Sequence, residues 1–427
     1  MDARNSPLML RRYLVVASIA AVVLTATAIW LGFALLHPTP PRTIAMATDP
    51  EGSLSAGLAE QYRELLARDG IDLRLVPSVG AVETVAHLRD PKSGISVGII
   101  PGGITNRQDS PGLVSLGTLF YEPLWLFYHG PRRAEKHENL RDRSVSIGPE
   151  GSGARALSLE LLARIGIIDQ RNTLLPLAPQ AATEKLLHGE IDVVIMLGAW
   201  ESPLVRQLLV AKDVHLANVT RADAYVALYP YLSKLVLPAG VGDMAENRPP
   251  TDVTLLAPKA SLVVRRDLHP AIQYRLLEAA AQIHSGAALF RKAGEFPAPE
   301  SIDLPLSDHA RQFYKTGPPF LQRHLPFWLA VLVQQLLVVL IPVLGLLYPV
   351  LRFAPQVYDW VVQRRVFALY GELKLLEDAL AARAAQDDIT DLVARLGELE
   401  ERASRFRPPL YTLRLHLSLV RQRLTTR

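Results

Sequence analysis

The sequence contains no cysteine and no strong excess of either charge, and each absence excludes a class of function. Without cysteine there is no disulfide, no thiolate ligand for zinc or an iron–sulfur cluster, and no thiol nucleophile. Lys and Arg total 46 against 42 Asp and Glu, which gives a net charge of +4. A nucleic-acid-binding protein would concentrate basic residues on one surface. We therefore expect no nucleic-acid partner.

Catalytic motifs are also missing. The sequence has no His-Glu-x-x-His, no Gly-x-Ser-x-Gly, no P-loop and no Gly-x-Gly-x-x-Gly. Its 11 histidines are scattered, and Gly130 and Pro131 separate the closest pair, His129 and His137. We therefore expect no metal, no cofactor and no enzymatic activity. An enzyme would need a pair of titratable groups in a cleft, for which we consider four glutamates: Glu51, Glu83, Glu150 and Glu201.

Apolar residues, 49% of the chain, concentrate in two long uncharged stretches, residues 13–36 and 327–351. Each stretch is long enough to cross the ~30 Å hydrocarbon core of a bilayer as a helix. Trp328 and Tyr348 stand near the two ends of the second stretch, where aromatic residues often anchor a helix at the interface. We predict two transmembrane helices, although the first stretch also fits a cleaved signal peptide.

Arginines set the expected orientation. Arg11 and Arg12 precede the first stretch and Arg352 follows the second, so the positive-inside rule places both termini in the cytoplasm. The region between the stretches is then periplasmic, and the protein lies in a bacterial inner membrane. The expected organisation is a cytoplasmic N-terminus (1–12), a transmembrane helix (13–36), a Pro-rich spacer (37–42), a two-lobed domain (43–326) with lobe crossings near 120–130 and 245–255, a transmembrane helix (327–351) and a cytoplasmic tail (352–427).

The cytoplasmic tail has the pattern of amphipathic helices. Leu373, Leu376 and Leu380 share one face of a first predicted helix, and Leu396 and Leu399 share one face of a second. We predict a small helical bundle or a coiled-coil tail, which is either a stalk that packs only on itself or a platform for a partner.

The region between the apolar stretches alternates short apolar runs with helical periodicity, which is typical of an α/β fold. Such alternation predicts mostly parallel sheets covered by helices on both faces. The expected strands are residues 43–47, 73–77, 95–100, 145–147 and 191–197, and the expected helices are residues 54–68, 84–89, 155–165 and 183–188.

Two glycine-containing loops follow predicted strands and open predicted helices. In the first loop, Gly52 permits a sharp turn and Ser53 can cap the helix; in the second, Ser152 can donate its hydroxyl. The free amides of such helix starts favour an anion, and Arg155 can bind a carboxylate through two hydrogen bonds. These loops predict an anion site in a cleft between two lobes.

These residues resemble a known family. The segments 47–53, 77–83, 121–123 and 145–153, together with Arg265-Arg266-Asp267-Leu268, are similar to TAXI-type solute receptors of TRAP transporters (TRAP-associated extracytoplasmic immunogenic proteins). The resemblance implies a two-lobed type 2 periplasmic-binding-protein fold that binds a small organic anion or an amino acid and delivers it to TRAP-type permease subunits. The ligand contacts it implies are Gly52, Ser53, Ser78, Gly80, Pro101, Gly102, Tyr121, Gly151, Ser152, Gly153, Arg155 and Trp200.

The sequence also departs from the family pattern. The first loop of the family usually reads Gly-Gly-Thr-Tyr, whereas here Ser53, Leu54 and Ser55 follow Gly52. The loop thereby lacks a threonine hydroxyl and an aromatic wall, so either a different ligand or weaker binding is expected. We expect a membrane-tethered solute receptor, and as the alternative a sensor or scaffold that relays cleft closure to a cytoplasmic partner through the C-terminal helix.

Overall fold

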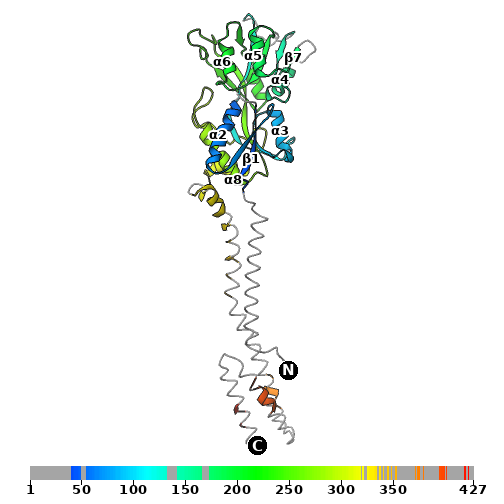
Figure 1. Ribbon diagram of the computed structural model, residues 1–427, viewed down its shortest axis with the longest axis vertical. Helices are drawn as coiled ribbons and strands as arrows, with labels where there is room; N and C mark the ends of the chain where they lie inside the picture. Colours follow the sequence, from blue (N-terminus) through cyan, green and yellow to red (C-terminus); the bar gives the residue numbers. More distant parts are fainter. Residues whose placement is uncertain are drawn as a thin grey trace. The chain divides into compact units, whose positions relative to one another are not determined.

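The computed structural model describes residues 40–49, 54–131, 142–165, 173–318, 320–321 and 325–333, together with single residues and short stretches between 336 and 422. The chain divides into two compact units, one made of Met1–Pro38 with Leu332–Arg427 and the other of Thr39–Val331. All named strands and helices lie in the unit Thr39–Val331. Within that unit they form two lobes (Figure 1).

The first lobe is built on a sheet whose strand order is β2-β1-β3-β11-β4. Strands β2 (Asp72–Pro77), β1 (Thr43–Thr48) and β3 (Ile95–Pro101) are parallel. Strands β11 (Val253–Arg265) and β4 (Leu113–Tyr121) run antiparallel to their neighbours. The sheet is therefore mixed.

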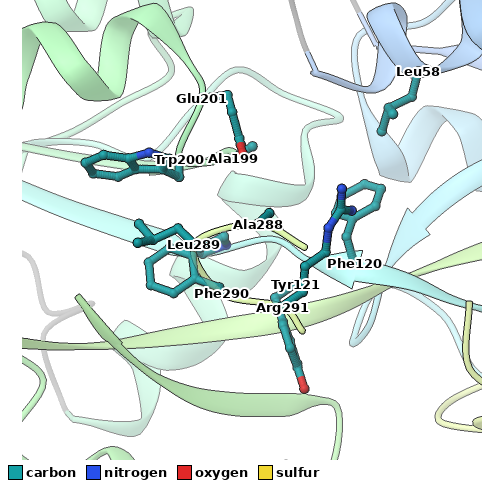
Figure 2. A pocket seen from close by; sticks show the side chains of 11 residues that line it. Leu58, Phe120, Tyr121, Ala199, Trp200, Glu201, Ala288, Leu289, Phe290 and Arg291 are labelled. Carbon is teal, nitrogen blue, oxygen red and sulfur yellow. The ribbon is translucent and has the colours of Figure 1, made fainter. Parts of the chain in front are cut away.

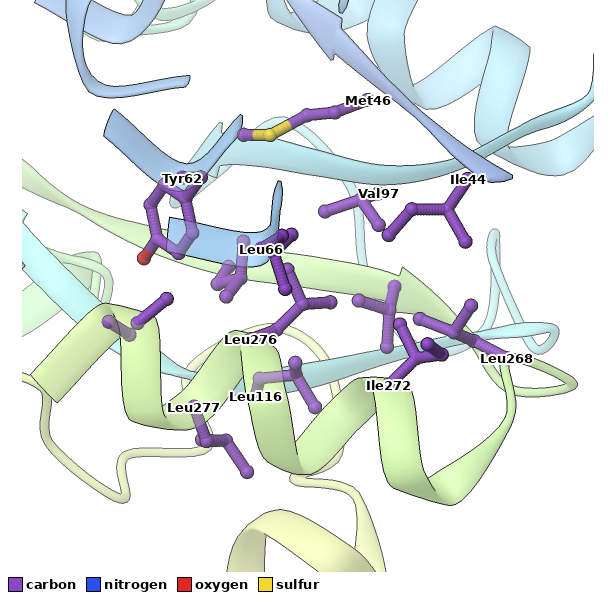
Figure 3. Close-up of a cluster of buried hydrophobic side chains, with 14 of the residues drawn as sticks. Ile44, Met46, Tyr62, Leu66, Val97, Leu116, Leu268, Ile272, Leu276 and Leu277 are labelled. Atoms are coloured by element: carbon purple, nitrogen blue, oxygen red, sulfur yellow. The ribbon is translucent and has the colours of Figure 1, made fainter. Parts of the chain in front are cut away.

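Helices cover both faces of this sheet because alternate residues of β1 are apolar on both sides. Met46 packs with α2 (Leu54–Arg68) and α8 (Pro270–His284), whereas Ala47 packs with α3 (Ala81–Arg89). Figure 3 shows the larger of these cores, in which side chains of α2 and α8 meet those of the sheet. The lobe also holds the short 3-10 helix η2 (Pro91–Ser93) and α9 (Asp308–Thr316).

The second lobe repeats the same plan with shorter strands. Its sheet has the order β5-β8-β6-β7, with β9 against β5 and β10 against β11. The strands are β5 (Leu124–His129), β6 (Ser144–Ser146), β7 (Thr173–Leu175), β8 (Val193–Leu197), β9 (Val214–Leu216) and β10 (Leu232–Leu237). The helices are α4 (Gly153–Arg164), α5 (Pro179–Leu187), α6 (Pro203–Val210) and α7 (Ala222–Leu228).

The chain crosses between the lobes at two places. The first crossing is the short link from β4 to β5, residues 121–124. The second is β11 itself, whose first half pairs with β10 and whose second half pairs with β3 and β4. Both crossings are extended backbone, which is the usual form of a hinge between two lobes.

The predicted α/β fold is confirmed, but the prediction of mostly parallel sheets is wrong. Every strand and helix predicted between the two apolar stretches overlaps one that forms, and β4, β5, β10 and β11 add antiparallel pairs to both sheets. The reason is topological, because a strand that serves two lobes must run against the parallel strands of at least one of them.

Of the two predicted transmembrane stretches, residues 13–36 lie outside the described residues and residues 327–351 are described only in part. Within the described parts of the chain, no helix combines the length and apolarity needed to span a bilayer. In the predicted tail, the described side chains of Leu373, Leu396 and Leu399 are buried.

The beginning of the second apolar stretch packs against the first lobe. Phe327 is 2% exposed and belongs to the core of that lobe, with the Arg275 guanidinium 5.2 Å from its ring centroid. The Trp328 indole Nε1 donates to the Asp69 carbonyl at 2.9 Å, and the Arg42 guanidinium lies 5.4 Å from the Trp328 ring centroid. Trp328, expected at a membrane interface, is thus bonded to the turn after α2.

Candidate functional site

Two helix N-termini, one from each lobe, meet at the interface between the lobes. Helix α3 begins after Gly80, and α4 begins after Ser152, whose hydroxyl accepts a hydrogen bond from the Arg155 amide at 3.2 Å. Such a cap satisfies one of the amides that a helix start leaves unpaired. The Val82 amide of α3 donates to the Gly151 carbonyl at 3.1 Å. The loops at 78–80 and 151–153 therefore touch each other directly.

Glycine makes this close approach possible. A Cβ built on Gly80 would lie 2.8 Å from the Cα of Ser152, and a Cβ on Gly153 would lie 3.3 Å from the Cβ of Ala81. The first of these contacts is with backbone, which cannot turn aside as a flexible side chain would. The two lobes meet this closely because position 80 carries no side chain.

The serine hydroxyls predicted to contact a ligand form hydrogen bonds inside their own lobes. The Ser78 Oγ lies 2.9 Å from the Thr84 Oγ1 and donates to the Thr48 carbonyl at 3.2 Å. The Ser152 hydroxyl donates to the Pro149 carbonyl at 2.8 Å in addition to capping α4. Neither hydroxyl has its proton free for a ligand in this arrangement.

The remaining predicted contacts of these loops have different surroundings. Pro101 pairs with Ala260 in the sheet, and a Cβ on Gly102 would lie 2.7 Å from the Cβ of Tyr231, so Tyr231 fills the space beside Gly102. One terminal nitrogen of Arg155, Nη1, is buried without a hydrogen-bond partner in the described structure. Gly52 and Ser53 lie outside the described residues.

A pocket of about 540 Å³, part of it open to solvent, lies beside the first lobe crossing. It combines the crossing itself with α2, the loop that follows β8 and the loop that follows α8 (Figure 2). Of the twelve predicted contacts it contains Tyr121 and Trp200. Its lining residues are Leu58, Phe120, Tyr121, Pro123, Ala199, Trp200, Glu201, Ala288, Leu289, Phe290 and Arg291.

Both predicted aromatic residues are fixed by contacts outside the pocket. The Tyr121 hydroxyl donates to Glu295 Oε1 at 3.0 Å, and its ring packs edge-to-face on Phe296 with centroids 5.1 Å apart. Figure 2 shows this ring pointing away from the other lining side chains. Burial and the Glu295 hydrogen bond raise the pKa of Tyr121 to about 12, so its hydroxyl stays protonated. The Trp200 ring has the Arg206 guanidinium 5.8 Å from its centroid.

The pocket lining includes one cationic side chain, Arg291. Its backbone forms a tight hairpin with Ala288 through hydrogen bonds of 3.0 and 3.2 Å, and its Nε is buried without a partner among the described residues. Burial and the Arg291 charge lower the pKa of His284 to about 3, so the neighbouring imidazole is neutral. Glu201, the acidic residue of the lining, is exposed. The pocket therefore has an apolar wall that carries one cation, Arg291, and one exposed carboxylate, Glu201.

Two carboxyl groups that the sequence analysis did not select lie at the first lobe crossing. Asp49, directly after β1, accepts a hydrogen bond from the Ser55 hydroxyl, and Glu122 lies in the crossing with its amide bonded to the Pro258 carbonyl at 2.9 Å. Burial and the nearby Asp49 charge raise the pKa of Glu122 to about 8. Burial also raises the pKa of Asp49. The pair therefore retains a proton near neutral pH.

The four glutamates considered for catalysis do not form a pair within the described residues. Glu83 accepts a hydrogen bond from the Val79 amide at the start of α3, Glu201 lies in the pocket and Glu150 is exposed. Glu51 lies outside the described residues. In the part of the chain that the structure describes, no group of three or more His, Asp or Glu side chains could hold a metal ion.

Sequence reasoning missed the loop that follows α8, which supplies Leu289, Phe290 and Arg291 to the pocket. It contains no motif, and it lies far along the chain from the crossing that it joins. An arginine at the end of a short apolar run is the one local signal, and it is too common to select a site on its own.

Comparisons with known proteins found solved structures of low sequence identity and one family model. The aliphatic sulphonate-binding protein SsuA from Escherichia coli matches with 15% identity over 57% of this chain and 73% of its own, at a TM-score of 0.38. SsuA from Xanthomonas axonopodis pv. citri bound to MOPS matches with 17% identity over 58% of this chain and 74% of its own, also at 0.38. An ancestral arginine-binding protein bound to arginine matches with 14% identity over 57% of this chain and 93% of its own, again at 0.38. The model of the NMT1-like family matches residues 103–316, which is half of the chain, and the protein therefore belongs to the NMT1-like family.

Proposed function

We propose that this protein is an extracytoplasmic solute receptor that binds a small organic anion or amino acid between its two lobes. The observation that carries the proposal is the pocket beside the crossing, because its walls come from both lobes and from the hinge between them. A ligand there would favour the closed arrangement through contacts that the open one lacks. Binding and closure need no nucleophile or general base, so the proposed activity is binding without catalysis.

We propose further that the receptor is held in a bacterial inner membrane and delivers its solute to TRAP-type permease subunits. The support for this is the resemblance of segments such as 145–153 to TAXI-type receptors, together with the uncharged stretches 13–36 and 327–351. Arginines outside both stretches support this orientation, with the termini in the cytoplasm and the two lobes in the periplasm, by the positive-inside rule.

A second candidate function is a sensor that relays lobe closure to a cytoplasmic partner. One observation favours it: Phe327 and Trp328, at the start of the second apolar stretch, are bonded and packed into the first lobe. A connection of this kind carries a change in the lobe into the segment that follows. A membrane-held transport receptor needs only a tether, because it delivers its solute outside the cytoplasm without passing a signal along the second apolar stretch.

A thermal-shift screen of the full-length chain in detergent tests the shared part of both candidates. The panel comprises amino acids, dicarboxylates, keto acids and aromatic acids, because a ligand that binds only the folded state raises the melting temperature by mass action. A dose-dependent shift with one class supports the receptor. A well-folded protein that shows no shift with any class would refute binding of a small anion or amino acid.

Removal of residues 352–427 separates the two candidates. A transport receptor without its tail still supports uptake in cells that contain the permease, at equal expression. A sensor without its tail still binds ligand but no longer changes the activity of its partner. Loss of both uptake and binding would instead indicate misfolding, which the melting temperature detects.

A further inference from the structure

The lining of the pocket combines a mostly apolar surface with two charged side chains. Nine of its eleven residues are apolar or aromatic, and the two charged ones, Arg291 and Glu201, differ in burial. The Nε of Arg291 is buried, whereas Glu201 is exposed. A ligand that fills the pocket therefore meets an apolar wall with one half-buried cation, Arg291, and one exposed carboxylate, Glu201.

Arg291, the cation of the lining, needs a partner of opposite charge. An Arg guanidinium stays protonated at all ordinary pH values, and its planar set of donors matches a carboxylate. Burial of Nε without a hydrogen bond costs free energy unless a ligand supplies the acceptor. The neighbouring His284 is neutral, has no exposed surface, and presents two nitrogens without partners among the described residues. Arg291 is thus the group in this wall that can neutralise an anion.

The apolar wall sets the body of the ligand. Phe120, Trp200 and Phe290 supply aromatic surface, and Leu58 and Leu289 supply branched aliphatic surface. Such surfaces favour aromatic or branched hydrocarbon groups, which gain from apolar burial and from ring contacts. A second carboxylate or a chain of hydroxyls would lose its hydration there without gaining hydrogen bonds.

The carboxylate of the lining restricts the class of ligand further. Glu201 repels a second negative charge on the ligand, which disfavours dicarboxylates. An α-ammonium group lies within a few bonds of its carboxylate and would therefore lie near the Arg291 charge. The carboxylate of the described lining, Glu201, is exposed, and an ion pair with an exposed carboxylate contributes little to binding.

From these observations, and resting on the proposed receptor function, we propose that the ligand is a monocarboxylate with an aromatic or branched apolar body, and that Arg291 binds its carboxylate. Phenylacetate and 4-methylpentanoate represent this class. L-Phenylalanine carries the same body with an α-ammonium group, and succinate and L-glutamate carry two carboxylates.

Calorimetric titration of the full-length chain in detergent with these five compounds tests the proposal. We expect phenylacetate or 4-methylpentanoate to bind at least about tenfold more tightly than the other three. Arg291→Gln should weaken that binding by about 20-fold or more, since it removes a charged hydrogen-bonding partner. Arg266→Gln, an exposed position away from the pocket, is the matched control for the loss of one positive charge and should leave the affinity unchanged.

Two further variants make the outcome specific. Glu201→Gln should improve succinate binding several-fold and leave phenylacetate binding unchanged, because the repulsion acts only on a second carboxylate. Arg155→Gln tests the arginine at the glycine loops, which also has a buried nitrogen without a hydrogen-bond partner among the described residues. If Arg155→Gln abolishes binding while Arg291→Gln does not, the carboxylate lies at the glycine loops and the proposal is wrong.

The remaining outcomes distinguish this proposal from the receptor function on which it rests. Tight binding of succinate or L-glutamate that is insensitive to Arg291→Gln refutes the monocarboxylate class and leaves the receptor intact. No binding of any compound here and no shift in the wider screen refutes both. Arg291→Gln protein is compared only if its melting temperature without ligand matches that of the parent chain.

Discussion

Replacement of Gly70 by alanine tests whether the start of the second apolar stretch is truly fixed to the first lobe. Gly70 ends the turn after α2 with φ at +71°, a left-handed conformation that favours glycine. A Cβ there would lie 3.3 Å from the Trp328 Nε1, which donates to the Asp69 carbonyl at 2.9 Å. The indole is held on its other side by contact with Phe327, whose ring centroid is 5.0 Å away. It therefore cannot move aside without weakening a contact.

The expected magnitude has two parts, and a matched glycine separates them. Gly94 has φ at +72°, and a Cβ built there meets nothing within 4 Å. Gly94→Ala therefore measures the left-handed backbone alone, at about 1 kcal/mol. Gly70→Ala adds the loss of much of one hydrogen bond, about 1 kcal/mol more. We expect Gly70→Ala to lower the free energy of unfolding by about 2 kcal/mol in total.

Pulse proteolysis of the full-length chain across a urea series gives the free energy of unfolding of both variants. Each is also made in a Trp328→Phe background, in which the indole donor is gone. The two alanine variants should then become equally destabilised, because the extra cost of Gly70→Ala depends on that donor. Equal destabilisation with Trp328 present, or a difference that persists with phenylalanine, would refute the fixed attachment.

Three other predictions follow from the same structure. Gly80→Ala should weaken ligand binding about 5- to 150-fold by holding the lobes apart, as overpacking typically costs about 1–3 kcal/mol. Gly112→Ala, with nothing within 4 Å of the added Cβ, should have no effect on calorimetric affinity. Because the pKa of Glu122 is raised to about 8, the folded protein holds a proton that the unfolded chain releases. The urea midpoint of unfolding should therefore fall as the pH rises toward about 8 and then level off. Glu122→Gln should remove that fall, and an unchanged slope would contradict the assignment. A fragment of residues 42–323 should melt well below one of residues 42–331, since it lacks two or more apolar side chains of the larger core of the first lobe. Burial of each such side chain contributes about 1.5–3 kcal/mol, and equal melting temperatures would contradict this prediction.

The parts of the fold that could be predicted are those determined by local pattern. β1 has apolar residues on both faces and is followed by a helical period, so its position follows from a dozen neighbouring residues. β11 could not be found in this way. Pro258 stands in its middle, which argues against a strand in a local reading, and its partners in the first lobe, β3 and β4, lie more than one hundred residues away in the chain. The antiparallel half of both sheets was missed for that reason.

The candidate site, like the fold, could be predicted only where a local sequence pattern determines it. The sequence placed glycine loops at the starts of helices, and the structure brings Gly80 and Gly151 together at the interface between the lobes. It could not place Arg291, because nothing in the residues around it indicates that the loop after α8 returns to the crossing. Which of the predicted contacts touch a ligand stays a prediction.

The contact between the lobes also bears on where specificity resides. At the glycine loops the lobes meet through backbone, and the hydroxyls of Ser78 and Ser152 are used within their own lobes. Backbone amides and carbonyls distinguish charge but discriminate poorly between one carbon skeleton and another. Discrimination needs side chains of distinct shape and charge, and Trp200 and Arg291 supply such side chains to the pocket beside the crossing. In the proposed receptor, the glycine loops would therefore limit how far the lobes close, and the aromatic pocket would select the ligand.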